Sequence, residues 1–489
     1  MLTPLAQGEA NRLRDYFSQC NYTTEGLREV LVVNELASRQ LRNLPRLLDR
    51  TGEGTPLHVL MRWFCFGVPV EAGAAAGAIP DRIIQPLLDC GLLTVQGTAL
   101  ASDTMLSPFE DLLVATDHSL KIEAGGDPEA VLVINPTTWL LHRYSVRRPC
   151  RAMLDLGAGC GAIGLSASSY SERVVATDLN PRATLFAAFN ASLNCRTNVE
   201  CLSGNAFEPV AGRKFDLILT NPPFFITPSP RYLFCENELE LDLFCRGLVK
   251  QAHKYLHEDG ILQMVCEWVE IQGQGWRERI AEWLEDSGCD AWVIKGHTED
   301  PSRYAQARIR ETTLGTPESD SSAYAEWMSY YRKHRVEAIH RGLIALRLRT
   351  GSNWVRIDEI PATPKAPFGN SILKGFAARD FLKRNSREDT LLTAVLKVSG
   401  DVRMERTWEF SGQRWKLDKL HLWLSTGMPN AQKLEPVVAE MIGALDGERT
   451  LGEAIDLTVS KTAGRQDEMR EQLMAIARRL IESGVVEWV

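Results

Sequence analysis

The sequence lacks the features that mark several classes of protein. Its 11 cysteines include no Cys-x-x-Cys pair, and none lies beyond Cys289, so neither a disulfide framework nor a structural zinc site is indicated. Its most apolar stretch, residues 57–80, is interrupted by Arg62, Pro69 and Glu71 and is too broken to cross a membrane. The beginning, MLTPLAQGEANRLRDYF, has no basic segment followed by an apolar run, so we expect no signal peptide. We therefore expect a cytoplasmic protein with reduced thiols, without a bound metal and without a membrane partner.

An excess of basic residues is also missing. The chain has 55 Lys and Arg against 63 Asp and Glu, a formal net charge of −8, which argues against a surface built as a whole to hold polyphosphate. A local basic groove is still compatible with this sum, because the distribution of charge matters more than its total. At 489 residues the chain is too long for one ordinary core, so we expect two or three domains.

Three regions differ in their patterns. Residues 1–105 have apolar residues at helical spacing and end in a short hairpin with its turn near Gly97, which predicts a mainly helical, winged-helix-like domain. Residues 106–350 alternate apolar runs with helical patterns, which predicts an α/β domain with a parallel sheet covered on both faces. Residues 351–489 end in a helix, a glycine and a short strand, so we expect an α+β domain that is again winged-helix-like.

The central region has seven candidate strands, and a helical insert at about 301–340 precedes the last of them. The candidate strands are residues 152–156, 173–178, 199–202, 215–220, 261–266, 291–294 and 343–349.

A glycine-rich turn follows the first of these strands, in Asp155-Leu156-Gly157-Ala158-Gly159-Cys160-Gly161. Glycines at this place let the backbone turn sharply and approach a ligand next to a helix N-terminus. Residues 159–164 also satisfy Gly-x-Gly-x-x-Gly, and Asp178 ends the next strand, so a nicotinamide-dinucleotide-dependent dehydrogenase is one interpretation. Asp155 favours a different interpretation, a site for a cationic sulfonium ligand. Its carboxylate suits such a cation and would repel a pyrophosphate.

The tetrapeptide Asn221-Pro222-Pro223-Phe224 directly follows the fourth strand, and loops at such strand ends line the ligand crevice. An amide or aryl-amine nitrogen shares its lone pair with a neighbouring π-system and therefore attacks a methyl group poorly. If the Asn221 side-chain oxygen and the Pro222 carbonyl each accept one N–H, the lone pair can point at a methyl group on sulfur, and the positive charge that develops on nitrogen is stabilised. The prolines fix the backbone so that this carbonyl is aimed beforehand, and Phe224 offers a flat face to a planar group.

Taken in order, each after a predicted strand, these motifs resemble the class I S-adenosylmethionine-dependent methyltransferases of the NPPY/NPPF type. That group includes the release-factor glutamine methyltransferases, adenine-amine DNA and RNA methyltransferases, and guanine-amine ribosomal RNA methyltransferases. The resemblance covers about residues 130–350 and implies a Rossmann-like, seven-stranded sheet. The whole chain is similar to bacterial methyltransferases that carry extra N- and C-terminal domains.

The resemblance also implies which residues bind the cofactor. The residues that would hold S-adenosylmethionine are Asp155, Gly157, Ala158, Gly159, Gly161, Asp178, Leu179, Asn205, Ala206 and Asn221. Asp155 and the glycine loop would hold its methionine part, Asp178 the ribose hydroxyls, and Leu179 would pack on the adenine. Many relatives have an Asp after the third strand that meets the adenine amine, whereas this chain has Asn205, whose amide oxygen can accept the same bond.

The acceptor of the methyl group is left open by these motifs. The regions on both sides of the central one favour a macromolecule, because a small substrate needs no flanking domains. Residues 143–148 and 330–335 combine aromatic with basic side chains, which suits nucleic acid, although clusters of this size are usually solvated faces. Residues 236–240 are acidic and would repel a phosphate backbone. We expect N-methylation of a planar NH₂ group on an RNA or DNA base or on a protein glutamine, with a small-molecule acceptor as the alternative.

Overall fold

The computed structural model describes residues 2–31, 40–118, 127–230, 232–312, 317–360, 368–426, 432–462 and 466–489. The chain divides into two compact units, one of Met1–Leu141 with Arg148–Glu359 and the other of His142–Arg147 with Ile360–Val489. Within the described residues, no helix is long and apolar enough to cross a membrane. In the same ranges, no group of three His, Cys, Asp or Glu side chains is arranged to hold a metal ion.

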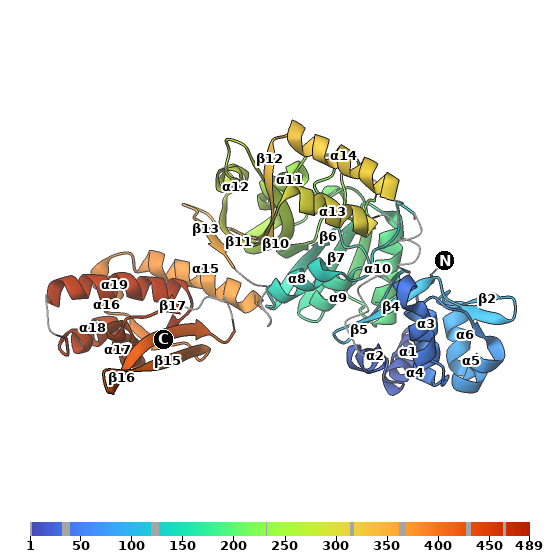
Figure 1. Ribbon diagram of the computed structural model, residues 1–489, viewed down its shortest axis with the longest axis horizontal. Coiled ribbons are helices and arrows are strands. Elements are labelled where there is room, and N and C mark those ends of the chain that lie inside the picture. Colours follow the sequence, from blue (N-terminus) through green and yellow to red (C-terminus); the bar gives the residue numbers. More distant parts are fainter. Residues whose placement is uncertain are drawn as a thin grey trace. The chain divides into compact units, whose positions relative to one another are not determined.

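A mixed sheet of eight strands, ordered β13-β11-β12-β10-β9-β6-β7-β8, organises the first unit (Figure 1). The strands are β6 (Cys150–Leu156), β7 (Ser171–Asp178), β8 (Val199–Ser203), β9 (Phe215–Thr220), β10 (Leu256–Ile271), β11 (Cys289–Glu299), β12 (Val336–Leu348) and β13 (Val355–Glu359). Strands β8, β7, β6, β9 and β10 are parallel, whereas β12 is antiparallel to both of its neighbours. The seven predicted strands are confirmed, and β13 is an eighth strand outside the predicted set, paired in parallel with β11.

Helices cover the sheet and meet the strand ends that matter for the site. These helices are α9 (Ala162–Ala167), α10 (Pro181–Leu193), α11 (Leu243–Tyr255) and α12 (Trp276–Leu284). Helix α10 begins at a definite place because the Asn180 side chain accepts the N–H of Arg182 at 2.9 Å and proline occupies the first helical position, a favoured start. Strand β9 is buried along almost its whole length, as expected for a central strand covered on both faces.

The N-terminal part of the first unit is mainly helical, as predicted. Its elements are α1 (Gln7–Gln19), α2 (Thr24–Leu31), α3 (Gln40–Arg50), α4 (Pro56–Phe64), β1 (Val70–Glu71), α5 (Ala72–Ala78), α6 (Asp81–Asp89), β2 (Thr94–Gln96), β3 (Ala99–Ala101), β4 (Thr104–Phe109) and β5 (Leu112–Asp117). The predicted hairpin is β2–β3, which turns at Gly97 with φ of +62°. Buried side chains of α1 and α4 share one apolar cluster with Phe186 and Phe189 of α10, so this part and the sheet form a single unit.

The predicted helical insert consists of α13 (Pro301–Thr312) and α14 (Pro317–Lys333), between β11 and β12. Its buried side chains Tyr304, Trp327 and Tyr331 form a small apolar cluster with Ile226, which lies just beyond the tetrapeptide. The insert therefore packs on the segment that follows β9.

The second unit is an α+β structure, as predicted. Its elements are α15 (Gly369–Arg384), α16 (Glu388–Leu392), β14 (Val395–Val398), β15 (Val402–Ser411), β16 (Arg414–Leu424), β17 (Gln432–Lys433), α17 (Pro436–Ala444), β18 (Asp446–Thr450), α18 (Leu451–Val459), α19 (Gln466–Glu482) and β19 (Val486–Trp488). Helix α18 starts in a capping box, in which Thr450 and Glu453 each accept a backbone N–H of the other, a strong start signal. The antiparallel hairpin β15–β16 was not among the predicted elements.

Candidate active site

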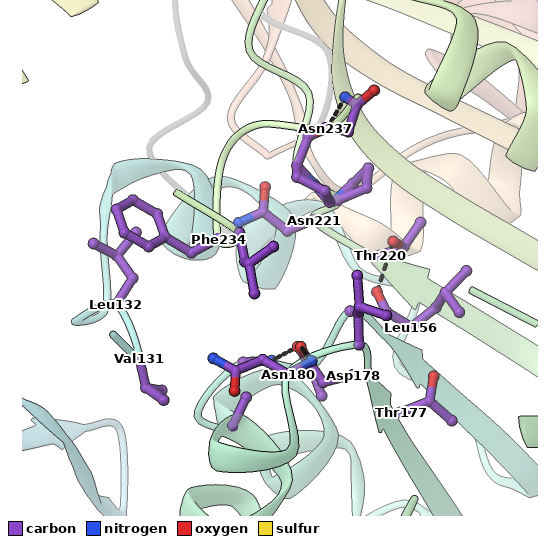
Figure 2. Close-up of a pocket in the computed structure, with 18 of the residues that line it drawn as sticks. Val131, Leu132, Leu156, Thr177, Asp178, Asn180, Thr220, Asn221, Phe234 and Asn237 are labelled. Carbon is purple, nitrogen blue, oxygen red and sulfur yellow. Dashed lines mark hydrogen bonds between the residues drawn. The ribbon is translucent and has the colours of Figure 1, made fainter. Parts of the chain in front are cut away.

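A cavity of about 550 Å³, here called the site cavity, opens at the carboxyl ends of β6, β7 and β9. Ligands bind at this edge in sheets of this type, and the volume is typical of a pocket for a cofactor-sized ligand. Figure 2 shows Asn221 above this space, Asp178 below it, and Phe234 with Leu132 at one side. The predicted site residues that line it are Asp155, Gly157, Ala158, Gly159, Asp178, Leu179, Asn205, Ala206, Asn221, Pro222 and Pro223.

The glycine loop after β6 is tied to the end of β7. The N–H groups of Gly157 and Ala158 both donate to the carbonyl of Thr177, at 2.9 Å each. Gly157 and Gly159 have φ of +71° and +55°, a conformation that a side chain strains and glycine does not. Gly161 does not line the cavity. A glycine is favoured there by close packing, because a Cβ at this position would come within 3.0 Å of a methyl group on α10.

Two carboxylates, Asp155 and Asp178, stand near the ends of β6 and β7. Asp155 accepts the N–H of Gly164 at 2.7 Å, and Asp178 accepts the N–H groups of Gly159 at 2.8 Å and Asn180 at 2.9 Å. Burial raises the pKa of Asp155 to about 7, the Gly164 N–H opposes this, and the charge of Asp178 adds to it. Burial also raises the pKa of Asp178, against its two N–H donors. A cation bound beside these groups would favour their ionised forms.

Asn221 follows β9 directly, and its side chain has a fixed orientation. Its Nδ2 donates to Thr137 Oγ1 at 3.2 Å. Thr137 in turn donates at 2.8 Å to Asn135, which precedes α8 (Pro136–Tyr144). The Oδ1 atom of Asn221 is buried and has no hydrogen-bond partner in the described part of the chain. Leaving such an oxygen without a partner costs about 1–3 kcal/mol, so an N–H group of a ligand would stabilise it.

The other residues of the tetrapeptide differ in where they lie. Pro222 and Pro223 line the site cavity, and the Pro223 carbonyl accepts a side-chain N–H of Asn237 at 2.8 Å (Figure 2). Phe224 is only 5% exposed and lies outside the lining. Its ring is enclosed by neighbouring side chains, so this position does not support the prediction that it faces the acceptor. The ring of Phe234, from the following loop, lines the cavity instead.

Three predicted cofactor contacts, Leu179, Asn205 and Ala206, line the cavity. Leu179 is 54% exposed, an unusual degree for a large apolar side chain, and a flat apolar ligand would cover it. Asn205 and Ala206 follow Gly204, whose N–H donates to the Asp178 carbonyl at 2.9 Å. The roles of these residues toward adenine stay predictions, and their positions are compatible with them.

The backbone beyond the tetrapeptide is fixed by the helical insert. Tyr331 of α14 donates its hydroxyl to the carbonyl of Ile226 at 2.8 Å, and Tyr304 of α13 accepts the Ile226 N–H at 3.2 Å. The Tyr304 hydroxyl itself donates to Glu267 of β10. Both polar groups of a fully buried backbone position are therefore satisfied by tyrosines from the insert.

Two arginines complete this support. Arg308 lies over the ring of Phe225, 4.5 Å from its centroid, and 3.7 Å from the buried carboxylate of Glu267. Arg341 donates to the same carboxylate at 2.9 Å. Tyr330, next to Tyr331, accepts the Leu241 N–H at 2.9 Å. Both tyrosines in the predicted nucleic-acid cluster 330–335 thus bind backbone near the site, and Tyr331, which is buried, cannot stack on bases.

Sequence reasoning missed two residues of the site. They are Asn180, whose N–H binds Asp178, and Phe234, and both line the cavity. The resemblance to the NPPY/NPPF methyltransferases also implies that residues 135–138 lie over the cofactor; Asn135 and Thr138 line the cavity, and Thr137 contacts Asn221. Phe234 had no comparable signal, because a backbone bond from the Phe225 N–H to the Cys235 carbonyl, at 2.8 Å, brings its loop to the tetrapeptide.

The lining of the site cavity is acidic. Among the described lining residues are Asp155, Asp178, Glu236 and Glu238, and none of the described lining residues is a lysine or arginine. The acidic segment 236–240 therefore contributes to the cavity, as the sequence suggested. Such a lining favours a cationic or neutral ligand and disfavours a phosphate.

Comparison with known proteins agrees with this geometry. Residues 134–272 match the family model of the methyltransferase small domain. Residues 19–103 and 374–487 match two models described as domains of unknown function.

Curated relatives match part of the chain. A release factor glutamine methyltransferase of Yersinia pestis is 35% identical over 180 residues, which cover 33% of this chain and 62% of that protein. A ribosomal protein uL3 glutamine methyltransferase of Xanthomonas campestris pv. campestris is 31% identical over 158 residues, covering 30% and 46%. The chain thus spans about half the length of these relatives. The segment that contains the glycine loop and the Asn-Pro-Pro-Phe motif matches the methyltransferase small domain and is similar to these glutamine methyltransferases.

Proposed function

We propose that this chain transfers a methyl group from S-adenosylmethionine to the side-chain amide nitrogen of a glutamine in a protein. The observation that carries the proposal is the buried Oδ1 of Asn221 at the edge of the site cavity, which has no hydrogen-bond partner among the described residues. This atom needs an N–H donor, and a primary amide supplies two.

The tetrapeptide acts on the acceptor by orientation. The Asn221 NH₂ group donates to Thr137, which fixes the amide so that its oxygen is left to accept a bond. The Pro222 carbonyl is proposed as the second acceptor, on a backbone stiffened by two prolines. Two accepted N–H bonds draw the acceptor nitrogen out of conjugation and stabilise the positive charge that develops on it. Holding reacting groups in line supplies about 7–11 kcal/mol, so a strong general base is unnecessary.

The residues around the cavity fit S-adenosylmethionine. When bound, this cofactor supplies an electrophilic methyl group on a positively charged sulfur. Asp155 and Asp178 offer carboxylates that its cation would keep ionised, and the glycine loop leaves open space where Cβ atoms would otherwise stand. The Thr177 Oγ1 atom is a second buried lining atom without a partner among the described residues, as expected where a polar ligand completes the site.

The charge of the lining favours a protein amide over a nucleic-acid base and over a nicotinamide dinucleotide. A nucleic-acid base brings phosphates with it, and a nicotinamide dinucleotide brings a pyrophosphate; both would meet the carboxylates of the site cavity. A glutamine side chain is neutral and brings no such charge. The relatives named as glutamine methyltransferases support the same choice.

The test is transfer of labelled methyl from S-adenosylmethionine, catalysed by the full chain. The acceptors are peptides in which one glutamine has neighbours of different charge, the same peptides with asparagine in its place, and RNA and DNA of matched length. We expect label on the glutamine peptides alone. Label on nucleic acid with none on any glutamine peptide would overturn the proposal, and so would a thermal shift with a nicotinamide dinucleotide but none with S-adenosylmethionine.

A further inference from the structure

The hairpin β15–β16 of the second unit is exposed along most of its length. In Figure 1 it lies on the side of that unit away from α15 and α19. Three large rings near its turn stand in solvent: Trp408 is 51% exposed, Phe410 60% and Trp415 65%. Such side chains are normally buried, and a contiguous exposed group of them marks an interaction surface.

The pairing register places these rings on one face. Phe410 lies opposite Trp415, and Trp408 lies opposite Leu417, so all four side chains point to the same side of the hairpin. The rings of Phe410 and Trp415 are 5.4 Å apart at an angle of 64°, an edge-to-face contact that holds them in place. Nearer the base, the same face carries Leu422, which is buried in the core of the unit. The face therefore begins in the core and continues into solvent as a row of aromatic rings.

The charges of the hairpin are mainly positive. Its strands contain five basic residues, Arg403, Arg406, Arg414, Lys416 and Lys419, and three acidic ones, Glu405, Glu409 and Asp418. Each acidic side chain has a basic neighbour: Glu409 lies opposite Lys416, Glu405 lies opposite His421, and Asp418 is 3.9 Å from Lys419.

Two exposed arginines lie close to the rings in the sequence of the hairpin. Arg406 and Arg414 are exposed, and neither belongs to an ion pair in the described part of the chain. Arg406 shares the aromatic face, two residues from Trp408. Arg414 precedes Trp415 at the turn and projects from the opposite face of the hairpin. We refer to Arg406, Trp408, Phe410, Arg414 and Trp415 together as the aromatic hairpin.

We propose that the aromatic hairpin binds single-stranded nucleic acid. Unstacked bases lie on exposed aromatic rings, and arginines beside the rings pair with the phosphates between successive bases. A protein partner would have to bury two unpaired guanidinium groups together with the rings, which is costly without matching carboxylates. The hairpin thus offers exposed rings and arginines to nucleic acid, whereas the described lining of the site cavity is acidic. Such a surface could hold the enzyme on an acceptor that is an assembly of protein and nucleic acid.

The test is fluorescence anisotropy of the full chain with labelled oligouridine and oligothymidine of about 12 nucleotides, a length within the usual site size. At about 50 mM salt we expect binding that weakens as salt rises. Replacing Trp415 by alanine should weaken binding about tenfold or more through lost stacking. Trp408→Phe should bind nearly as the wild type, because a phenyl ring still stacks, whereas Trp408→Ala should not.

Charge is tested separately. Arg406→Gln and Arg414→Gln should each lower the slope of log Kd against log salt by about 0.7, the value for one lost contact to single-stranded phosphate. The matched control is Arg387→Gln, an exposed arginine of the same unit that pairs with Asp389 and lies outside the hairpin. All these sites are exposed, and unchanged thermal unfolding midpoints will verify that each variant is folded.

Three outcomes would overturn the proposal. One is equal oligonucleotide affinity of the wild type and a Trp408→Ala/Trp415→Ala double variant. Another is equal affinity for a duplex of the same length, because paired bases cannot stack on the rings. The third is absence of oligonucleotide binding while anionic phospholipid vesicles or a protein partner are bound through the hairpin, which would assign the surface to that partner. Glutamine-peptide methylation should be unchanged in the double variant, so these results do not depend on the proposed reaction.

Discussion

The site cavity and the aromatic hairpin differ in charge and in the state of their aromatic residues. The cavity has four carboxylates and, in its described lining, no lysine or arginine. The hairpin has five basic residues against three acidic ones, and its rings are exposed. The formal net charge of −8 averages over both and describes neither. The comparison teaches that a site which disfavours phosphate and a surface suited to phosphate can belong to one chain.

The helical insert supplies a second contrast with the hairpin. Both segments contain neighbouring aromatic and basic residues in the sequence, at 330–335 and 406–416. In the insert Tyr331 is 1% exposed and bonded to the Ile226 backbone, whereas in the hairpin Trp415 is 65% exposed. Composition alone therefore does not separate a supporting cluster from a binding surface; the difference comes from what each ring packs against.

The largest effect should come from the cavity side of the comparison. Asn221→Ala removes the oxygen proposed to orient the acceptor, and we expect kcat to fall by about 10³-fold. The affinity for S-adenosylmethionine, measured by calorimetry, and the affinity for oligouridine should both change little. Asn385→Ala, a change of the same type just after α15, is the control. If Asn221→Ala retained full turnover, the assigned role of the tetrapeptide would be wrong.

The next effect concerns the acidity of the cavity itself. The pKa of Asp155 is raised by burial to about 7 in the folded chain, above its ordinary value, so its ionisation favours unfolding. The stabilisation that the protonated Asp155 gives to the folded chain is fully present at low pH and is lost as pH rises toward 7. Between about pH 5 and about pH 8 the loss should be on the order of 2–3 kcal/mol.

Asp155→Asn should remove this loss, because the amide does not ionise. The quantity to measure, without cofactor, is the thermal unfolding midpoint of the variant minus that of the wild type. This difference should be larger at about pH 8 than at about pH 5. Asp216→Asn is the control, since Asp216 accepts backbone N–H groups at the far end of β6. A difference that does not change with pH would contradict the raised pKa of Asp155.

Much of the fold and part of this site followed from local sequence. The strands of the sheet were predicted because each is a short apolar run before a turn or helix. The site residues at the ends of β6, β7 and β9 were predicted because parallel strands bring their carboxyl ends together. Asp155, Asp178 and Asn221 belong to this group. The glycine loop could be placed correctly for the same reason, because it directly follows one of these strands.

The parts that could not be predicted depend on tertiary contacts. Phe224 and Phe234 are both aromatic residues near the tetrapeptide, and only packing decides that the first is enclosed and the second lines the cavity. Strand β13 is short and half-exposed, so its pattern carries little signal until β11 offers it an edge. The aromatic hairpin was missed because its alternation places apolar residues in solvent, contrary to the usual rule for strands.

A smaller effect tests the support of the tetrapeptide. Tyr331→Phe leaves the Ile226 carbonyl without its donor, and the loop should hold Asn221 less well. We expect kcat to fall by about tenfold, the rate equivalent of about 1.4 kcal/mol, with little change in cofactor affinity. Tyr324→Phe is the matched control, because this tyrosine of α14 bonds to Ser302 within the insert. Equal loss of kcat in both variants would show a general effect of the insert and not a specific one on the loop.

The smallest effect should come from the cavity rim and would sharpen the comparison most directly. Glu238 lines the cavity and is exposed, so Glu238→Gln should raise KM for a glutamine peptide with basic neighbours by about two- to threefold, as for a solvent-exposed charge pair. The change should vanish at high salt and with an uncharged peptide. Glu240→Gln, an exposed acid outside the lining that pairs with Lys333, is the control. Since the rim and the hairpin are proposed to act on different chemistry, Glu238→Gln should leave oligouridine affinity unchanged; a gain in that affinity would mean that nucleic acid reaches the cavity, and the proposed separation of the two regions would fail.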